Sequence, residues 1–273
     1  MSTLRDYVTS AARDGHIAAA DIRAVADCFG FGLRETEEVA LELGIMPERY
    51  LRNTGSISME EQLKLLRSTV AVIGCGGLGG CLIEILARLG VGRLIVFDPD
   101  SFEEHNFNRQ LLCDTVSIGT PKSDAAVRRA AAVNPAVEVA AYRAAFTRSF
   151  GRAEIAGAHA VADALDDIQA RLELAVACRG LGVPLVHGAI AGWYGQVAVQ
   201  FPGEKILETV YPASGQAKGV EVRTGNPAFT PWAVASLQAA EISKILLGRP
   251  TALRGKLLCI DLENMDFQAV DIR

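Results

Sequence analysis

The sequence predicts an α/β fold, with a mostly parallel sheet, helices on both of its faces and an antiparallel C-terminal extension. Three observations support this prediction. Short apolar runs alternate with helical patterns between residues 69 and 181. The glycine-rich stretch GCGGLG joins the first of these runs to a helix. After residue 183 the alternation gives way to PLVHGAIAGWYGQVAVQF, which is typical of two strands, with Gly192 and Gly195 bracketing the turn between them.

The composition is that of an ordinary soluble globular protein. The chain has 273 residues, of which half are apolar and 22% are charged. No apolar run is long enough to span a bilayer and no signal segment opens the chain, so we expect a cytoplasmic protein that does not bind membranes. The six cysteines are scattered without a C-x-x-C pair, which favours free thiols and argues against a structural zinc site.

We predict a helical N-terminal appendage over residues 1–48 and a main domain over residues 49–273. Apolar residues recur at helical spacing at Leu4, Val8 and Ala11. The later stretch VADCFGFGLRETEEVALELGI has the outline of a helix-turn-helix. Residues 1–48 hold four arginines and nine acidic residues, however, which argues against binding to nucleic acid. A packed appendage or a dimer arm is the favoured interpretation.

Capping signals delimit the first elements of the main domain. Ser58, with Glu61 three residues later, forms a capping box for a helix in SISMEEQLKLL. The runs TVAVIG and GRLIVFD are predicted strands, and LIEILARLG between them is a predicted helix. Thr120 as cap and Pro121 at the first helical position predict a further helix in TPKSDAAVRRAAAV.

The remaining elements follow the same logic. The runs VEVAAYR and AHAVADAL are predicted strands, and residues 167–181 are a predicted helix. A long helix, apolar nearly all round and therefore buried, is delimited by Thr230 as cap, Pro231 at its first position, and Gly248 with Pro250 at its end. The run KLLCIDL is predicted to close the fold as its last strand.

The loop over residues 74–79 follows a strand and opens a helix, the context in which G-x-G-x-x-G indicates nucleotide binding. Glycine lets the backbone approach a phosphate, and the free N–H groups of the helix N-terminus hold the negative charge. Asp98 ends the second strand, at the spacing where an acid bonds ribose hydroxyls. The sheet is therefore expected to be Rossmann-like, although a nicotinamide dehydrogenase would show the same pair of features.

Two cations favour a triphosphate over a dinucleotide. Arg109 lies in the loop HNFNRQ, and guanidinium donors suit the larger charge of a triphosphate. Lys122 lies in the first turn of its predicted helix, where the helix dipole disfavours a cation by ~0.3–1 kcal/mol. A bound phosphate would recover that free energy. A solvated side chain is the alternative for each residue.

Asp166 and Asp167 follow a predicted strand at the carboxyl edge of the sheet, where open α/β folds bind ligands. A carboxylate near a triphosphate indicates Mg²⁺, which prefers oxygen ligands. We expect one of the two aspartates to be a helix N-cap instead, and Asp163 to be structural. With Arg109 and Lys122, these loops predict a site for a triphosphate and magnesium.

With these residues assembled, the chain resembles the ThiF/MoeB/HesA family, relatives of the ubiquitin-activating enzymes. The matching stretches cover about residues 49–250 and are RYLRNTGSISMEEQLKLLRSTVAVIGCGGLGG, DPDSFEEHNFNRQLL, GTPKSDAAVRRAAAVNP, VADALDDIQARLELAVAC and PWAVASLQAAEISKILLG. The resemblance implies an adenylyltransferase that uses ATP and Mg²⁺. Its substrate would be the C-terminal glycine of a small ubiquitin-like sulfur-carrier protein ending in Gly-Gly.

The resemblance also implies roles for individual residues. Catalysis would fall to Arg109, Lys122, Asp166 and Arg52, with Asp166 on the magnesium side. Arg52, in RYLR, matches an arginine that family members contribute across a homodimer to the partner's ATP. The residues implied to bind ATP are Gly74, Gly76, Gly77, Gly79, Asp98, Asp100, Asn106, Arg109, Gln110 and Lys122.

The chain departs from the family pattern at its cysteines. Many relatives carry two C-x-x-C pairs that bind zinc, but the corresponding residues 209–229 contain no cysteine, so no zinc site is expected. Cys178 is interpreted as a small buried side chain and His187 as a core histidine. Cys113, just past the arginine loop, is the one cysteine considered for reactivity.

The implied reaction needs no general base, because a C-terminal carboxylate with a pKa of roughly 3.5 is already ionised at neutral pH. Three alternatives stay open. They are the adenylation of a small-molecule or modified-tRNA carboxylate, a non-catalytic nucleotide-binding dimer, and a nicotinamide dehydrogenase. The lack of a basic surface argues against the tRNA alternative.

Overall fold

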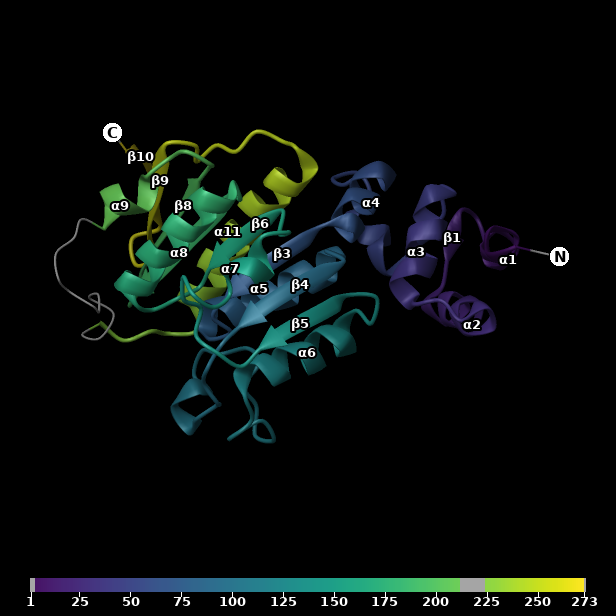
Figure 1. The fold of residues 1–273 in the computed structure, drawn as a ribbon, viewed down its shortest axis with the longest axis horizontal. Helices are drawn as coiled ribbons and strands as arrows, with labels where there is room; N and C mark the ends of the chain where they lie inside the picture. Colours follow the sequence, from purple (N-terminus) through teal and green to yellow (C-terminus); the bar gives the residue numbers. More distant parts are fainter. Residues whose placement is uncertain (1–2, 212–223, 273) are drawn as a thin grey trace.

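A sheet of eight strands forms the centre of the computed structural model, which describes residues 3–211 and 224–272 (Figure 1). In these residues the strand order is β10-β9-β8-β7-β6-β3-β4-β5. The strands are β3 (Thr69–Ile73), β4 (Arg93–Phe97), β5 (Glu138–Tyr142), β6 (Ala160–Asp163), β7 (Leu185–Ala191), β8 (Tyr194–Gln200), β9 (Lys256–Asp261) and β10 (Asp266–Asp271).

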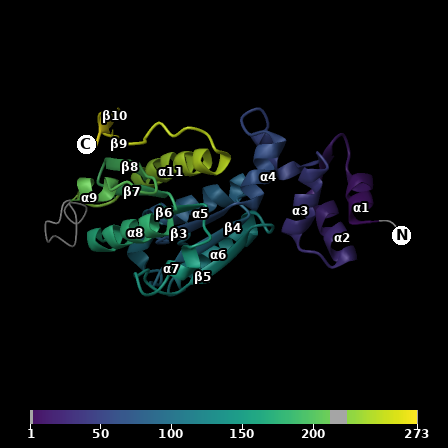
Figure 2. The same ribbon diagram turned by 45° about the horizontal axis from the view of Figure 1, so that its top comes forward.

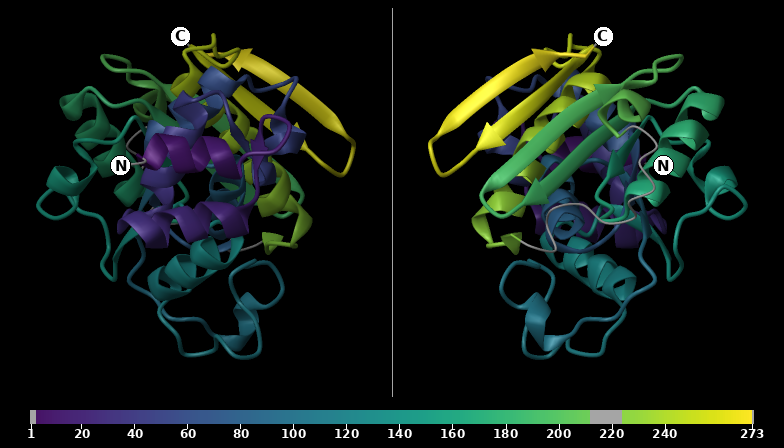
Figure 3. Two further views of the ribbon diagram at one scale, coloured as in Figure 1. Left: turned by 90° about the vertical axis from the view of Figure 1, so that its right-hand side faces the viewer. Right: turned by 90° about the vertical axis from the view of Figure 1, so that its left-hand side faces the viewer.

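The direction of pairing changes once across the sheet. The strands β5, β4, β3, β6 and β7 are parallel to one another, whereas β7, β8, β9 and β10 pair antiparallel. The right-hand view of Figure 3 shows the green and yellow strands of this antiparallel part at the end of the molecule away from the N-terminal helices. The prediction of a mostly parallel sheet with an antiparallel C-terminal extension is confirmed.

Helices cover both faces of the sheet because successive strand residues point to opposite sides. On β3, Val70 and Val72 belong to the core under α4 (Met59–Arg67), α5 (Gly77–Leu89), α6 (Lys122–Val133) and α11 (Phe229–Leu247). Ala71 and Ile73 belong to the core under α7 (Arg152–Ile155), α8 (Ile168–Leu181) and α9 (Ile206–Val210). Both faces of β3 and β4 are therefore buried, and every residue of these two strands after the first is apolar.

The sequence predicted the longer helices of the main sheet but not the short helices α7 and α9, and it placed two caps wrongly. The capping box of Ser58 at α4 is confirmed. Helix α6 begins at Lys122 with an extended Pro121 as its N-cap, because Pro121 pairs with Ser101 in an isolated bridge. Thr120 is therefore not the cap. Helix α11 begins at Phe229, and its buried Thr230 hydroxyl donates to the Gly192 carbonyl oxygen at 2.6 Å instead of capping the helix.

A group of three helices, called the N-terminal unit below, precedes the sheet. It contains α1 (Leu4–Ala11), α2 (Ala19–Phe29) and α3 (Leu33–Glu42), with a two-residue parallel pair of β1 (His16–Ile17) and β2 (Met46–Pro47) that the sequence did not predict. Its helices bury a hydrophobic cluster of their own. The 3-10 helix η1 (Glu48–Asn53) joins it to α4. Figures 1 and 2 both place this unit at one end of the molecule.

The C-terminal strands hold two further differences from the prediction. The run KLLCIDL is β9 and not the last strand, since β10 follows it as the sheet edge. All six residues of β10 are exposed, so the strand lacks the alternation of buried and exposed positions that would have revealed it. Gly195 lies within β8 and not at the turn. No helix in the described ranges is long and apolar enough to cross a membrane.

Candidate active site

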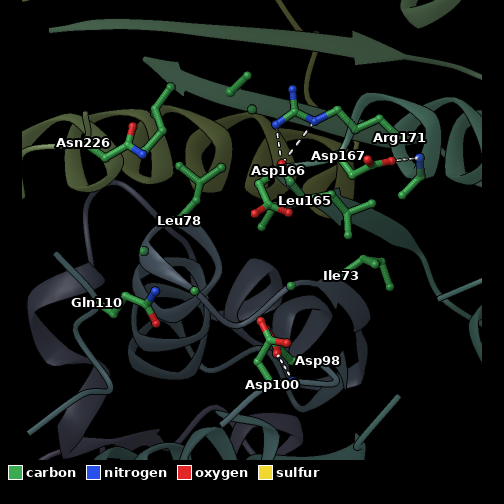
Figure 4. A pocket seen from close by; sticks show the side chains of 18 of the residues that line it. Ile73, Leu78, Asp98, Asp100, Gln110, Leu165, Asp166, Asp167, Arg171 and Asn226 are labelled. Atoms are coloured by element: carbon green, nitrogen blue, oxygen red, sulfur yellow. Dashed lines mark hydrogen bonds between the residues drawn. The ribbon is translucent and has the colours of Figure 1, made fainter. Parts of the chain in front are cut away.

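A cavity of about 890 Å³ opens where β3, β4 and β6 end. The loops after these strands, the start of α8 and the β7–β8 pair build its wall. Figure 4 shows labelled side chains from several of these segments around one space. The residues of the predicted site that line it are Gly74, Gly76, Gly77, Asp98, Asp100, Asn106, Arg109, Gln110, Lys122 and Asp166. Gly79 and Arg52 do not line it.

Two glycines of the loop are required by close backbone packing. Gly74 has a φ of +100°, and a Cβ there would lie 2.6 Å from the carbonyl oxygen of Ala164. A Cβ on Gly79 would lie 1.8 Å from the carbonyl oxygen of Gly74. Such approaches are too short for any side chain. Gly79 therefore acts behind the cavity wall, where it lets α5 pack against the loop.

The other two glycines bring the arginine loop against the cavity. A Cβ on Gly77 would lie 3.5 Å from Cγ of Arg109, and a Cβ on Gly76 would lie 3.7 Å from Nε2 of Gln110. The side chains of Arg109 and Gln110 thus lie beside the N-terminus of α5. Backbone N–H groups and a guanidinium converge at this point, which makes it the most favourable place in the cavity for an anion.

Asp98 fastens the glycine loop to the end of β4. Its Oδ2 accepts a hydrogen bond from the Cys75 N–H at 2.7 Å, and its Oδ1 accepts one from the Asp100 N–H at 2.9 Å. The residue is 5% exposed, and burial raises the pKa of its carboxyl, which the two N–H donors only partly offset. Each carboxylate oxygen retains further acceptor capacity, so Asp98 can hold the loop and still bond a hydroxyl group.

Lys122 lies in the cavity wall and is only 8% exposed. Its Nζ is 3.1 Å from Oδ2 of Asp100, and its backbone N–H donates to the Asp100 carbonyl oxygen at 2.9 Å. The carboxylate compensates for a cation in the first turn of α6, a position that the helix dipole disfavours. The sequence showed this conflict but not the partner that relieves it.

The arginine loop is folded by its own polar groups. Oδ1 of Asn106, in the short helix η2 (Glu104–Asn106), accepts from the Glu103 N–H at 3.0 Å. Nη1 of Arg109 donates to the His105 carbonyl oxygen at 3.3 Å and to Oδ1 of Asn108 at 2.9 Å. Both of these bonds stay within the loop and use a single guanidinium nitrogen. The other N–H groups of the Arg109 guanidinium have no hydrogen-bond partner among the described residues.

Two amide oxygens in the cavity wall are buried without a partner in the described structure. They are Oε1 of Gln110 and Oδ1 of Asn226. An unpaired buried acceptor destabilises a protein by ~1–3 kcal/mol, so such groups commonly mark a place where a ligand supplies the missing donor. Asn226 was not predicted, although Gly225 and Pro227 on either side of it, just before a long helix, are a usable signal for a loop at the site.

The two aspartates after β6 have different environments. Oδ1 of Asp167 accepts from the Ala170 N–H at 2.8 Å as the N-cap of α8, so the expectation that one of the pair is a cap is confirmed. Asp166 is exposed to the cavity and makes no hydrogen bond or ion pair with any described residue. Its carboxylate is the uncommitted one.

The donor set fits a magnesium ion that arrives with a nucleotide. In the part of the chain that the structure describes, no group of three or more His, Cys, Asp or Glu side chains could hold a metal by itself. Mg²⁺ characteristically uses one or two carboxylates, water and substrate phosphates. Asp166 supplies one such carboxylate.

A buried polar chain extends from the far end of the cavity. Nδ1 of His187 is hydrogen-bonded to Oδ2 of Asp163 at 2.7 Å, and its Nε2 lies 3.1 Å from the hydroxyl of Tyr211. Arg171 donates to the same hydroxyl at 2.9 Å. Burial lowers the pKa of His187. His187 and Asp163 are core residues, as predicted, whereas Tyr211 and Arg171 line the cavity and were not predicted because only the folded chain brings them together.

Arg52 lies far from the cavity of its own chain. It is exposed in η1 and has no hydrogen bond or ion pair within the described ranges. Its neighbour Tyr50 packs against Gly90, just before the amino end of β4. The cavity lies at the carboxyl ends of the strands. Arg52 therefore lies on the opposite side of the sheet's strand ends from the cavity of its own chain.

Neither of the two cysteines singled out in the sequence has the features of a reactive thiol. Cys178 is fully buried, and burial raises the pKa of its thiol to about 12. Cys113 is half-buried, and burial raises the pKa of its thiol as well, which argues against an activated nucleophile. Of the cysteine-free residues 209–229 considered for zinc, residues 212–223 lie outside the described residues.

Comparison with known proteins finds a matching family, similar sequences and a similar solved structure. A model of the ThiF family matches residues 50–273. The SAMP-activating enzyme E1 of Haloferax volcanii is 37% identical over 231 residues, 83% of this chain and 85% of that protein. A sulfur carrier protein adenylyltransferase of Thermus thermophilus is 35% identical over 80% of this chain and 83% of that protein. The crystal structure of E. coli MccB with ATP matches with a TM-score of 0.66 and 18% identity, over 92% of this chain and 82% of that one.

Proposed function

The chain belongs to the ThiF family, and from this premise we propose that it adenylates the C-terminal glycine of a small ubiquitin-like sulfur-carrier protein. It is a sulfur carrier protein adenylyltransferase, the activity that the 35% identical relative of Thermus thermophilus has in its name. One observation supports the reaction chemistry most strongly. A glycine loop, two cations and an uncommitted carboxylate, all from separate segments, line the same cavity.

The cavity suits ATP at its glycine-loop end. The N–H groups at the start of α5 and the guanidinium of Arg109 would hold phosphate oxygens, and Asp98 would accept a hydrogen bond from a ribose hydroxyl. Lys122 would contribute its ammonium once a phosphate replaces Asp100 as its partner. Mg²⁺, when bound, neutralises phosphate charge, and Asp166 would hold it.

In the reaction, a carboxylate oxygen of the terminal glycine attacks the α-phosphorus of ATP. A bond forms between that oxygen and phosphorus, and the bond from phosphorus to the bridging oxygen breaks, so pyrophosphate leaves with the electron pair. The attacking carboxylate is already ionised, and no residue of the chain has to remove a proton. The chain's own contribution is therefore to position two anions and to offset their mutual repulsion.

A second copy of the chain would complete the site. Arg52 is exposed, unpaired within the described part of the chain, and located at the opposite end of the sheet from its own cavity. A symmetric dimer would place Arg52 of each subunit at the cavity of the other, where a guanidinium adds to the charge available for the phosphates.

We expect ATP–pyrophosphate exchange to require a carrier protein. The purified chain should exchange labelled pyrophosphate into ATP only when a ubiquitin-like sulfur carrier with an intact Gly-Gly end is added. The matched control is the same carrier without its last two glycines, which should support no exchange. Exchange with small carboxylic acids or tRNA and without any carrier would contradict the proposal. ATP binding without exchange, across a panel of carriers from the same genome, would indicate a non-catalytic protein.

Mixing two inactive variants tests the contribution of Arg52. Arg52→Ala and Arg109→Ala should each lose most exchange activity alone. In a mixture, a heterodimer keeps one complete site, formed by the intact cavity of the Arg52→Ala subunit and the intact Arg52 of the other. With random association of a symmetric dimer, the mixture should recover about a quarter of wild-type activity. No recovery, with heterodimers present by mass spectrometry, would rule out sharing between subunits.

A further inference from the structure

We infer that Glu37, on helix α3 of the N-terminal unit, is a positioning residue for adenylation. It holds η1 in the orientation that presents Arg52 to the cavity of the partner subunit. This inference rests on the proposed function, and specifically on the sharing of Arg52 across a dimer. It gives the N-terminal unit a role that neither the sequence nor the family resemblance supplied.

Glu37 takes part in a buried polar network on η1. The hydroxyl of Tyr50 donates to Oε2 of Glu37 at 3.0 Å, and Nη1 of Arg49 lies 3.3 Å from Oε1 of Glu37. Asn134 binds the same two residues of η1, since its Nδ2 donates to the Tyr50 hydroxyl at 2.8 Å and its Oδ1 accepts from Arg49. The side chain of Glu37 is 0% exposed. The network therefore clamps η1 between the N-terminal unit and the main domain.

The geometry of η1 connects this network to Arg52. A 3-10 helix has three residues per turn, so Arg49 and Arg52 lie on the same side, one turn apart. Tyr50 and Asn53 share the next side in the same way, and Nδ2 of Asn53 donates to Oε1 of Gln62 at 3.1 Å. Holding Arg49 and Tyr50 fixes the rotation of η1 about its axis, and that rotation decides where Arg52 points.

The main-domain side of the clamp is built on the two helices that start at the cavity. Helix α5 begins at Gly77 and α6 begins at Lys122, both in the cavity wall. Asn134 directly follows α6, and its Nδ2 also donates to the carbonyl oxygen of Ala87 near the end of α5, at 3.0 Å. Each subunit thus carries its phosphate-binding groups and its Arg52 support at opposite ends of the same two helices.

Apolar contacts alone would attach the N-terminal unit without fixing this orientation. Leu41, Met46, Tyr50 and Leu66 form a small hydrophobic cluster at the junction. Hydrophobic burial is non-directional, whereas the hydrogen bond from Tyr50 and the ion pair with Arg49 hold the buried carboxylate of Glu37 in one geometry. A carboxylate with no exposed surface is rare unless it is paired, and both partners of Glu37, Arg49 and Tyr50, lie on η1.

The test combines Glu37→Gln with the two variants that define the shared site. Glu37→Gln alone should lower ATP–pyrophosphate exchange roughly ten- to a hundredfold, as expected for a displaced catalytic group. Mixed with Arg109→Ala, it should recover about a quarter of wild-type activity, because the cavity of the Glu37→Gln subunit is intact and its partner supplies a well-placed Arg52. Mixed with Arg52→Ala, it should recover nothing, because neither subunit can donate Arg52 properly.

The opposite pattern would overturn the inference. If Glu37→Gln recovered with Arg52→Ala and not with Arg109→Ala, the defect would lie in the cavity of its own subunit. Wild-type exchange by Glu37→Gln alone would also overturn it. If Arg52→Ala and Arg109→Ala fail to complement each other, the shared site itself is wrong, which is a separate and distinguishable failure.

Two further variants guard against simple misfolding. Tyr50→Phe keeps the ring and removes only the hydroxyl that joins Glu37 to Asn134, and it should reproduce the complementation pattern of Glu37→Gln with a smaller loss of activity. Glu38→Gln is the matched control. Glu38 lies next to Glu37 on α3 but pairs with Arg67 on the surface, and its replacement should leave exchange unchanged. If Glu38→Gln lost as much exchange activity as Glu37→Gln, general destabilisation of α3 would explain both losses and the inference would be wrong.

Discussion

Replacing Arg109 by alanine is expected to lower the rate of ATP–pyrophosphate exchange by roughly 10²–10³-fold, the usual effect of losing one preorganised donor to a developing charge. The side chain lies against Gly77 at the start of α5. Its two described hydrogen bonds come from one nitrogen, so the guanidinium can engage a phosphate without giving up the fold of its loop. Lysine at this position should not restore the rate, because an ammonium lacks the planar fork.

The same variant should remain folded. Arg109 bonds only to groups of its own loop, so we expect the free energy of unfolding of the protein to change by less than about 0.5 kcal/mol. Arg88→Ala is a matched control, because Arg88 lies on α5 outside the cavity and pairs with Glu84. It should keep wild-type exchange. Near-normal exchange by Arg109→Ala, measured with saturating carrier and ATP, would remove the arginine loop from the proposed site.

Replacing Asp166 by asparagine should produce a comparable loss of ~10²–10³-fold together with a higher requirement for magnesium. Asparagine keeps the size of the side chain and removes the charge that favours a hard cation. A titration of exchange against Mg²⁺ should show the midpoint moved to higher concentration. Because Asp166 makes no bond within the described structure, the thermal unfolding temperature should stay at its wild-type value.

Replacing the neighbouring Asp167 should lower stability and leave the magnesium requirement unchanged. Asp167→Ala removes the N-cap of α8 and should destabilise the protein by ~0.5–2 kcal/mol. Its magnesium titration midpoint should remain that of the wild type. If Asp167→Ala moved the magnesium midpoint and Asp166→Asn did not, the two roles would have to be exchanged.

The sequence was most informative at positions where the structure permits few residue types. The glycine loop and the apolar strand runs could be located because close backbone packing and burial on both faces leave few other choices. The assignments of Thr120 and Thr230 as caps were wrong for a common reason. A Thr-Pro pair permits a helix to begin on either side of the proline, and only long-range bonds to Asp100 and Gly192 decide the outcome.

Other features had no local signal at all. Strand β10 has every residue exposed, so no alternation marks it. Tyr211 and Arg171 meet across 40 residues of sequence, and the pattern around either residue predicts no contact. The position of Lys122 was suspicious from the helix dipole alone, yet the identity of its partner required the fold. Local propensity thus located the elements, and tertiary packing decided which polar groups meet.

The salt bridge between Lys122 and Asp100 would also make the enzyme selective about which anions it admits. Without nucleotide the ammonium of Lys122 already has the carboxylate of Asp100 as its partner. Because both residues belong to one chain, this carboxylate is present at a high effective concentration. A free orthophosphate ion, abundant in cells, would gain little by displacing it. If Asp98 holds the ribose of a nucleotide, the phosphates of that nucleotide are also kept close to Lys122 and can compete with Asp100 for the ammonium. The protein without nucleotide would therefore bind orthophosphate weakly, including the orthophosphate that forms when its product, pyrophosphate, is hydrolysed.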